Sequence, residues 1–127
     1  VIGRSLVVGK PAAMMLMGKN ATVTVCHTKT VNTAEICKGA DIIVSAAGVL
    51  NSLTADFVRP GQIVIDVSIN WDANKPNAKC GLGGIAGDAK FDEVEPIVEA
   101  ITPVPGGVGS VTTSVLMKHV VEAAERV

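Results

Sequence analysis

The segment 3–9 constrains the fold most, because its two glycines interrupt an apolar strand and precede an apolar helical run. Val1 and Ile2 read as the end of that strand, and residues 12–17 are an unbroken apolar run closed by Gly18, which predicts a short buried helix with a glycine cap. The spacing Gly3-x-Ser5-x-x-x-Gly9 is a variant of the dinucleotide-binding fingerprint, with a serine at its second glycine. Such a turn leaves backbone N–H groups at the helix start free to bind an anion.

Beyond this turn, short β-branched segments alternate with helical patterns. This alternation predicts βαβ units and therefore an α/β, Rossmann-type three-layer fold, with a mostly parallel sheet and helices on both faces. The 127 residues suffice for one nucleotide-binding domain, spanning 1–127. Strands are expected at 21–27, 41–45, 62–67 and 100–102, with 62–67 at the centre of the sheet. Helical segments are expected at 33–38, at 54–58 with Thr54 as the cap, and at 92–98. A closing helix should carry Leu116, Val120, Ala123 or Ala124, and Val127 on one face.

Two other segments bear on the domain's extent. Residues 71–87 are rich in Asn, Asp, Lys, Pro and Gly, which indicates a long surface loop or an irregular hairpin. The first strand is unusually short, so we expect upstream residues to be missing or the domain to be part of a longer protein. No apolar run approaches the ~20 residues of a membrane span, so we expect a soluble chain without a membrane partner.

Charge is unevenly distributed along the chain. Residues 1–40 have a net charge of +4, against −1 for the whole sequence. Aromatic residues make up only 2% of the chain, so this basic third is a poor nucleic-acid surface. It suits a small phosphorylated ligand, although a simply solvated face is the alternative.

The cysteines give no indication of a metal site. Cys26, Cys37 and Cys80 show no C-x-x-C spacing, which favours reduced thiols. His27 adjoins Cys26, but neighbouring residues on a strand point to opposite faces, so the two are poor co-ligands.

Cofactor preference should be read at the end of the second strand, where NAD enzymes usually carry an acid. Residues 26–30 contain no carboxylate, while Arg4, Thr28 and Lys29 could donate hydrogen bonds to a 2′-phosphate. This pattern favours NADP. His27 and Lys29 could instead be solvated loop residues.

Two further segments fall where α/β folds bind ligands. Asp66-Val-Ser-Ile-Asn70 ends an apolar strand, although Asn70 could be only a turn residue. Pro103-Val-Pro-Gly-Gly-Val-Gly109 is a second glycine-rich loop before a helix, and its prolines and glycines are typical of main chain that approaches a ligand closely.

Five motifs together resemble the methylenetetrahydrofolate dehydrogenase/cyclohydrolase family: 3–11, 27–30, 66–70, Gly87-Asp88 and 101–109. The resemblance implies a two-domain enzyme that oxidises 5,10-methylenetetrahydrofolate with NADP and hydrolyses the product to 10-formyltetrahydrofolate. It also implies a homodimer, a folate substrate, a role in purine biosynthesis and a cytoplasmic location, with the mitochondrion as the alternative. This chain resembles only the C-terminal cofactor-binding domain.

The resemblance also assigns residues. Gly3, Arg4 and Ser5 would bind cofactor phosphates and ribose, Thr28 would contact the 2′-phosphate, and Ile69 would pack near the nicotinamide. The folate would contact Pro105, Gly106, Gly107, Val108 and Gly109. The family's catalytic lysine belongs to a Tyr-x-x-x-Lys motif in the other domain, and this sequence has no tyrosine. We therefore expect no catalytic residue in this chain, and an isolated domain that is inactive.

Three positions depart from the family pattern. Ser68 replaces a glycine, Ser110-Val111 replaces Pro-Met, and Thr28 replaces a serine while keeping the hydroxyl. Two other functions remain open: a dehydrogenase of related fold with another small substrate, and a non-catalytic dinucleotide-sensing module.

Overall fold

A parallel sheet lies at the centre of the computed structural model, which describes residues 1–73, 75 and 84–126. Its strands are β1 (Ile42–Ser45), β2 (Ile63–Asp66) and β5 (Ala100–Ile101), in the order β1-β2-β5. Ile43 pairs with Val64, and Val64 in turn with Ile101. Of the four predicted strands, the segments 41–45, 62–67 and 100–102 contain β1, β2 and β5, and β2 is central as predicted.

Two single-bridge segments extend the sheet beyond β1. Ile2 forms parallel bridges to both Ser45 and Cys26, so the spatial order is Cys26, Ile2, β1, β2, β5. The predicted strand 21–27 is formed only as a bridge at Cys26, whose N–H donates to the Val1 carbonyl and whose carbonyl accepts from the Gly3 N–H. The strand order reverses at the Ile2 segment, because the chain passes first to the Cys26 segment on one side of it and then to β1 on the other. Such a switch point is where open α/β sheets bind ligands.

The main core lies on one face of this sheet. There α2 (Thr33–Lys38), η1 (Ala55–Phe57) and α3 (Phe91–Val94) pack on β1 and β2. Thr54 precedes η1 as predicted, but its side chain makes no capping hydrogen bond, and α3 is shorter than the predicted 92–98. The buried cluster consists of Cys37, Ile43, Leu53, Val58, Val64, Ala89 and Val94.

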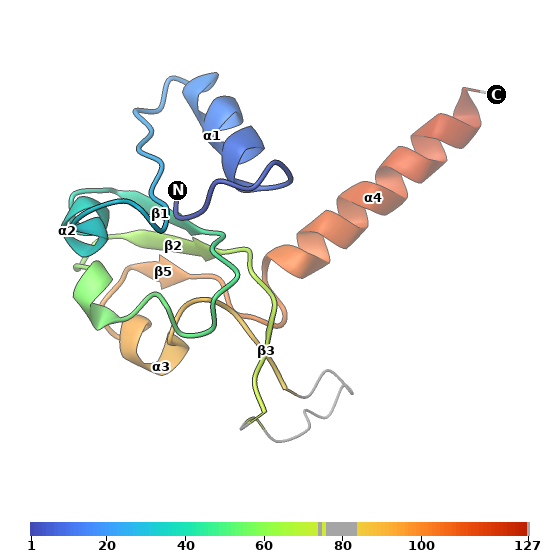
Figure 1. Ribbon diagram of the computed structural model, residues 1–127. Coiled ribbons are helices and arrows are strands. Elements are labelled where there is room, and N and C mark those ends of the chain that lie inside the picture. The colour runs from blue at the N-terminus through green and yellow to red at the C-terminus, as the bar shows by residue number, and fades with distance from the viewer. Residues whose placement is uncertain (74, 76–83, 127) are drawn as a thin grey trace.

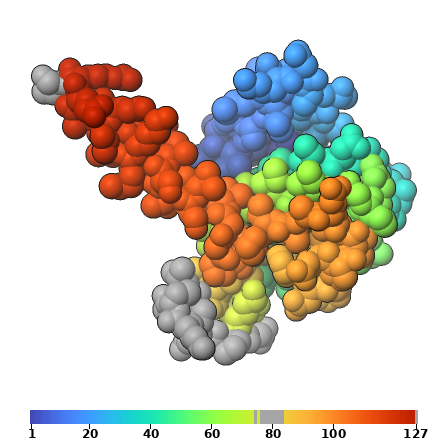
Figure 2. Space-filling view, turned by 180° about the vertical axis from the view of Figure 1, so that it is seen from behind, coloured from blue at the N-terminus to red at the C-terminus, as the bar shows by residue number. Residues whose placement is uncertain are grey.

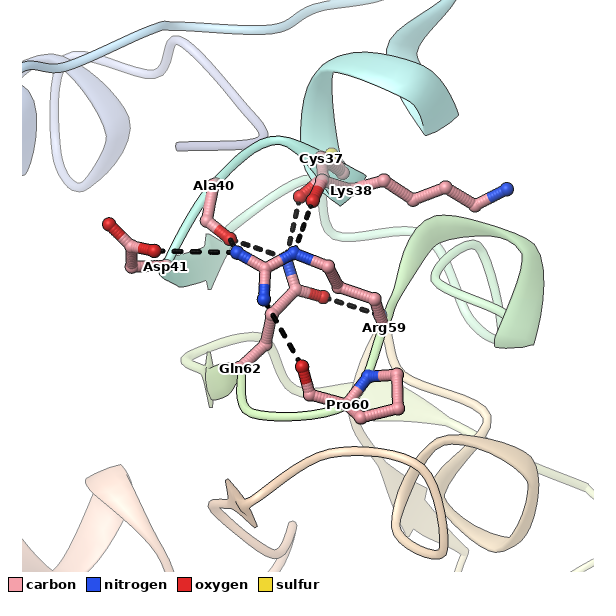
Figure 3. A network of polar contacts seen from close by, with 7 residues as sticks. All are labelled: Cys37, Lys38, Ala40, Asp41, Arg59, Pro60 and Gln62. Carbon is pink, nitrogen blue, oxygen red and sulfur yellow. Dashed lines mark hydrogen bonds and ion pairs between the residues drawn. The ribbon is translucent and has the colours of Figure 1, made fainter.

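A polar network joins the end of α2 to the start of β2 (Figure 3). The Gln62 amide donates to the Cys37 and Ala40 carbonyl oxygens at 2.8 and 2.6 Å, and its Oε1 accepts from the Arg59 N–H at 2.6 Å. The Arg59 guanidinium donates to the Lys38 carbonyl at 2.8 Å. Side chains from one connection thus satisfy the carbonyls that a helix end leaves without partners.

Helix α1 (Gly9–Met17) lies apart from that core, above the sheet in Figure 1. The prediction of a buried helix is wrong: only Gly9 and Ala13 are buried, while Met14 and Met15 are 66% and 73% exposed. The outer side of α1 has no described element packed on it, so its apolar run faces solvent. Gly18 ends the helix in a right-handed rather than a left-handed conformation.

Helix α4 (Val108–Glu125) projects from the body as a single rod (Figures 1 and 2). None of its described residues is buried, and Leu116 and Val120, which were predicted to share one face, are exposed. Val127 lies outside the described residues. Within the described ranges, neither α4 nor any other helix combines the length and apolarity needed to cross a bilayer.

The segment 71–87 begins and ends as a hairpin. Strand β3 (Asn70–Trp71) pairs antiparallel with β4 (Ile85–Ala86), which agrees with the second of the two predicted forms. Residues 74 and 76–83, and with them Cys80, lie outside the described residues. Cys26 and Cys37 are buried free thiols.

Candidate functional site

Five connections lie at the carboxyl ends of the parallel strands, along one edge of the sheet. They are the turn 3–8, the turn 27–30, the loop 46–49 after β1, the loop 67–70 after β2, and the loop 102–107 after β5. Four of these five contain residues that the sequence singled out. The tertiary fold therefore brings the predicted site segments to a single edge, at the position where α/β proteins bind nucleotides.

Close backbone packing shapes the first turn. Gly3 has φ of +119°, and a side chain there would collide with the carbonyl oxygen of Ala46. A side chain at Gly9 would in turn collide with the carbonyl group of Gly3. Both predicted glycines are thus required, the first by conformation and contact and the second by contact alone. Gly3 places the turn 3–8 directly against the loop after β1.

Ser5 has a structural role in this turn. Its Oγ accepts hydrogen bonds from the N–H groups of Val8 and Gly9, at 3.0 and 3.3 Å, and so caps the first turn of α1. The N–H groups of residues 4–7 have no protein acceptor in the described part of the chain, and all four residues are exposed. An exposed set of unpaired amides before a helix attracts an anion. The Arg4 side chain is exposed beside it.

The turn 27–30 is held by its own side chains. The Thr30 hydroxyl oxygen accepts from the His27 N–H at 2.9 Å, and His27 Nδ1 accepts from the Lys29 N–H at 3.1 Å. Thr28 is left exposed at its tip. The Gly3 N–H donates to the Cys26 carbonyl at 2.8 Å, so this turn adjoins the first. Arg4 and Thr28 therefore project from neighbouring loops of the same edge.

A buried carboxylate, Asp88, joins the loops after β1 and β2. Its Oδ2 accepts from the Ser45 and Ser68 hydroxyls, at 3.1 and 2.7 Å, and from the N–H groups of Ala47 and Gly48. Its Oδ1 accepts from the Val49 N–H at 2.8 Å and from the Asn70 side-chain amide at 3.0 Å. All six donors are neutral, and the residue is fully buried.

Burial acts to raise the pKa of Asp88, but hydrogen bonds from Asn70, Ser68 and the main chain outweigh it and lower the pKa of this carboxyl. Asp88 is therefore an ion inside the protein, held without a cationic partner among the described residues. A carboxylate that accepts this many hydrogen bonds fixes the position of each donor.

The pKa of Asp66, at the end of β2, is shifted in the opposite direction to that of Asp88. Burial raises its pKa, although the N–H groups of Ala89 and Ser68 donate to its carboxylate oxygens at 2.7 and 3.1 Å. Gly87 lies so close that a side chain there would collide with the Asp66 carboxylate. Asp66 thus anchors the chain on both sides of Asp88.

Ile69 lies between two residues tied to Asp88, and its side chain is 69% exposed. Asn70 was left open as a ligand or as a turn residue. Its amide nitrogen is engaged by Asp88, so in this structure it holds the loop. Ser68 is buried, and its hydroxyl oxygen also accepts from the Gly48 N–H at 3.2 Å.

The second glycine-rich loop is shorter than the sequence indicated. Val108 and Gly109 belong to the first turn of α4, so the loop ends at Gly107, whose missing side chain makes room for the Pro103 carbonyl. The helix therefore begins two residues earlier than the glycines suggested. Pro105 and Gly106 are exposed, and the Val104–Pro105 peptide bond is cis.

A hollow of about 310 Å³ lies beside this loop, lined in part by Asp66, Gly87, Lys90, Thr102 and Val104. None of the residues assigned to cofactor or folate lines it. The predicted site residues are therefore arranged along an open edge rather than inside this hollow.

Sequence reasoning missed the organising role of Asp88, together with Ser45 and the loop 46–49. The motif Gly87-Asp88 was visible, but its role depends on hydroxyl and amide donors from positions 18 to 43 residues away. An acid directly after a glycine, in an otherwise apolar stretch, was the signal available.

Comparisons with known proteins agree with this geometry. The family model described as "Tetrahydrofolate dehydrogenase/cyclohydrolase, NAD(P)-binding domain" matches residues 1–127. The chain is 57% identical over 125 residues to the bifunctional protein FolD of Carboxydothermus hydrogenoformans, covering 98% of this chain and 42% of that protein. It is 51% identical over 126 residues to a FolD protein of Clostridium botulinum, again covering 42% of the relative.

Solved structures show the same pattern. The bifunctional 5,10-methylenetetrahydrofolate dehydrogenase/cyclohydrolase of Thermoplasma acidophilum superposes with a TM-score of 0.84 at 44% identity, over 98% of this chain and 42% of that one. The Trypanosoma brucei enzyme, described as complexed with NADP cofactor and an inhibitor, gives 0.85 at 38% identity with the same coverage. The chain spans about two fifths of the length of these relatives.

Proposed function

The chain belongs to the tetrahydrofolate dehydrogenase/cyclohydrolase family as its NAD(P)-binding domain, and we propose that it binds NADP as part of a longer bifunctional enzyme. That enzyme would oxidise 5,10-methylenetetrahydrofolate to the methenyl compound and hydrolyse this to 10-formyltetrahydrofolate. The remaining three fifths of the relatives' length would include the N-terminal domain to which this proposal assigns catalysis.

One observation carries the proposal for NADP. Four exposed N–H groups without protein acceptors, in residues 4–7, lie beside a turn 27–30 that contains no carboxylate. The amides suit a diphosphate, and the neighbouring Arg4 and Thr28 suit an additional phosphate on the ribose. An acid in this turn would instead favour a free 2′-hydroxyl. The donor set therefore fits NADP better than NAD.

NADP, when bound, supplies the hydride acceptor. This chain's residues bind and orient it: Gly3 allows close approach of the backbone, Arg4 and Ser5 contact phosphate and ribose, and Ile69 packs against the ring end. Asp66 and Asp88, the two carboxyls of this edge whose pKa values are shifted, are both buried among their hydrogen-bond donors. Proton transfer is accordingly assigned to the other domain.

The loop after β5 is proposed to face the folate. Pro105 and Gly106 are exposed on the same edge as the dinucleotide turn, and Gly107, Val108 and Gly109 lead into α4. Contact between this loop and the folate would place the methylene carbon beside the nicotinamide, so orientation is the domain's contribution to rate. The homodimer, the cytoplasmic location and the role in purine biosynthesis remain predictions from the resemblance.

The cofactor assignment is tested by titrating Arg4→Ala with NADP and with NAD. We expect NADP affinity to fall by about tenfold, the effect of one charge-assisted contact to phosphate, with NAD affinity changed much less. Lys19→Ala is the matched control, because it removes one exposed positive charge beyond the end of α1. An Arg4→Ala variant that keeps its preference for NADP would show that Arg4 does not read the 2′-phosphate.

The enzymatic assignment is tested by measuring turnover of methylenetetrahydrofolate by the full-length protein and by this chain alone. We expect activity only in the full-length protein. Binding of NADP without any turnover or folate affinity in the full-length protein would instead indicate a dinucleotide-sensing module.

A further inference from the structure

Ile69 is the most exposed residue of the loop after β2, yet both of its neighbours are fixed to one buried group. Ser68 Oγ donates to Asp88 Oδ2 at 2.7 Å, and Asn70 Nδ2 donates to Asp88 Oδ1 at 3.0 Å. The two oxygens of a single carboxylate therefore hold the residues before and after Ile69. The side chain of Ile69 itself points to solvent, with 69% of it exposed.

The same carboxylate also fixes the loop after β1. The N–H groups of Ala47 and Val49 donate to this carboxylate, each at 2.8 Å. The Gly48 N–H makes a bifurcated hydrogen bond to Asp88 Oδ2 and Ser68 Oγ. This loop supports the first turn, since Gly3 packs against the Ala46 carbonyl. Asp88 thus connects the phosphate-binding turn to the Ile69 loop through a continuous set of short contacts.

We propose that Asp88 and Ser68 are positioning residues that set the distance between the loop 46–49 and Ile69, and thereby the fit of the nicotinamide half of the dinucleotide. The proposal rests on NADP binding at this edge, as proposed above. Neither side chain touches the cofactor, because both are buried behind the loops that they hold. Their effect on binding is transmitted through Ile69 and the amides of the loop 46–49.

Ser68 gives the two loops a direct link. A glycine at this position would have no hydroxyl to join Asp88 with the Gly48 N–H. The serine hydroxyl donates to the first and accepts from the second, so it directly ties one loop to the other. A hydrogen bond to an ionised acceptor is stronger than one between neutral groups.

The test compares two serine-to-alanine variants in the full-length protein that contains this chain. Ser68→Ala removes the hydroxyl that ties the loops together. Ser45→Ala removes a buried hydroxyl that donates to the same Asp88 oxygen, at 3.1 Å, from within β1. Each variant is titrated with NADP and with adenosine 2′,5′-bisphosphate, which has the 2′-phosphate end but lacks the nicotinamide.

We expect Ser68→Ala to weaken NADP binding by about three- to tenfold, the range for one lost hydrogen bond, and to leave the bisphosphate affinity unchanged. Ser45→Ala should alter the two affinities by the same factor. Asn70→Ala, which releases the other side of Ile69, should behave like Ser68→Ala. The ratio of the two affinities is the readout that a general loss of stability does not move.

Equal changes of both affinities in Ser68→Ala and Asn70→Ala would overturn the proposal, since the residues would then be merely structural. So would a Ser45→Ala variant with the same selective loss of NADP affinity. A wild-type protein that binds neither ligand would instead refute NADP binding itself, and this inference would fall with it.

Discussion

Replacing Gln62 by leucine should destabilise the domain strongly, because this side chain is fully buried and uses all its polar atoms. Its amide group links the Arg59 N–H to the carbonyls of Cys37 and Ala40 at the end of α2 (Figure 3). Leucine has a similar volume, so the substitution removes hydrogen bonds without creating a large cavity.

The magnitude follows from what each partner retains. The Cys37 carbonyl keeps the Ala40 N–H at 3.1 Å, and the Ala40 carbonyl keeps the Arg59 guanidinium at 3.2 Å. The Arg59 N–H loses its acceptor altogether. Three lost bonds at about 1 kcal/mol each, one of which leaves an unpaired donor, give a loss of about 3 kcal/mol in the free energy of unfolding.

Glutamate at the same position distinguishes hydrogen bonding from packing. Its carboxylate can still accept from the Arg59 N–H, but its second oxygen would face the carbonyl oxygens of Cys37 and Ala40. Ionisation is therefore disfavoured in the folded state, which raises the pKa of the new carboxyl above its unfolded value of about 4.3. The protonated form stabilises the fold below that value, and this contribution is lost as pH rises through the folded pKa.

Urea unfolding of wild type and both variants, at about pH 7 and about pH 5, measures these differences. Gln62→Glu should be less stable than Gln62→Leu at the higher pH and should approach or exceed it at the lower pH. The gap between wild type and Gln62→Leu should be the same at both. A loss below about 0.5 kcal/mol in Gln62→Leu would refute the assigned hydrogen-bond energies.

Three other predictions follow from the described contacts. Gly9→Ala should destabilise the chain and weaken dinucleotide binding, because the new methyl group would collide with the Gly3 carbonyl. Gly109→Ala is the control, because it lies in the first turn of α4 and its methyl group would meet open space. In thermal unfolding, Gly109→Ala should raise stability by up to about 1 kcal/mol. Burial, with Cys26 nearby, raises the pKa of Cys37 to about 11. Iodoacetamide at neutral pH should therefore label the Cys37 thiol only after denaturation. Rapid labelling of Cys37 in the folded chain would contradict its burial. The pKa of Asp88 is lowered on folding, so its ionisation stabilises the fold above the unfolded pKa of about 3.9, and this stabilisation is lost as pH falls through the folded pKa. Asp88→Asn should therefore reduce the loss of stability at acid pH. An unchanged dependence of the free energy of unfolding on pH would exclude Asp88 as the source of that loss.

The sequence by itself determined the α/β class and most of the elements. The helix 33–38 was predicted with its observed bounds, and the apolar segment 62–67 was identified as the central strand. These succeed because hydrophobic periodicity and strand burial are local properties of the chain. Gly3 and Gly9 were also identified correctly, because a strand, a turn and a helix in succession require close backbone approach there.

Only the tertiary structure decided how far each element is covered and which side chains organise the edge. The apolar residues of α1 form an unbroken run and those of α4 recur at helical spacing, yet most of them are exposed, because such patterns do not tell what lies against the helix. Asp88 reads as an ordinary acid in the sequence. Its role depends on donors brought from β1 and from the loops after β1 and β2, and such long-range convergence is fixed by sheet order rather than by local sequence.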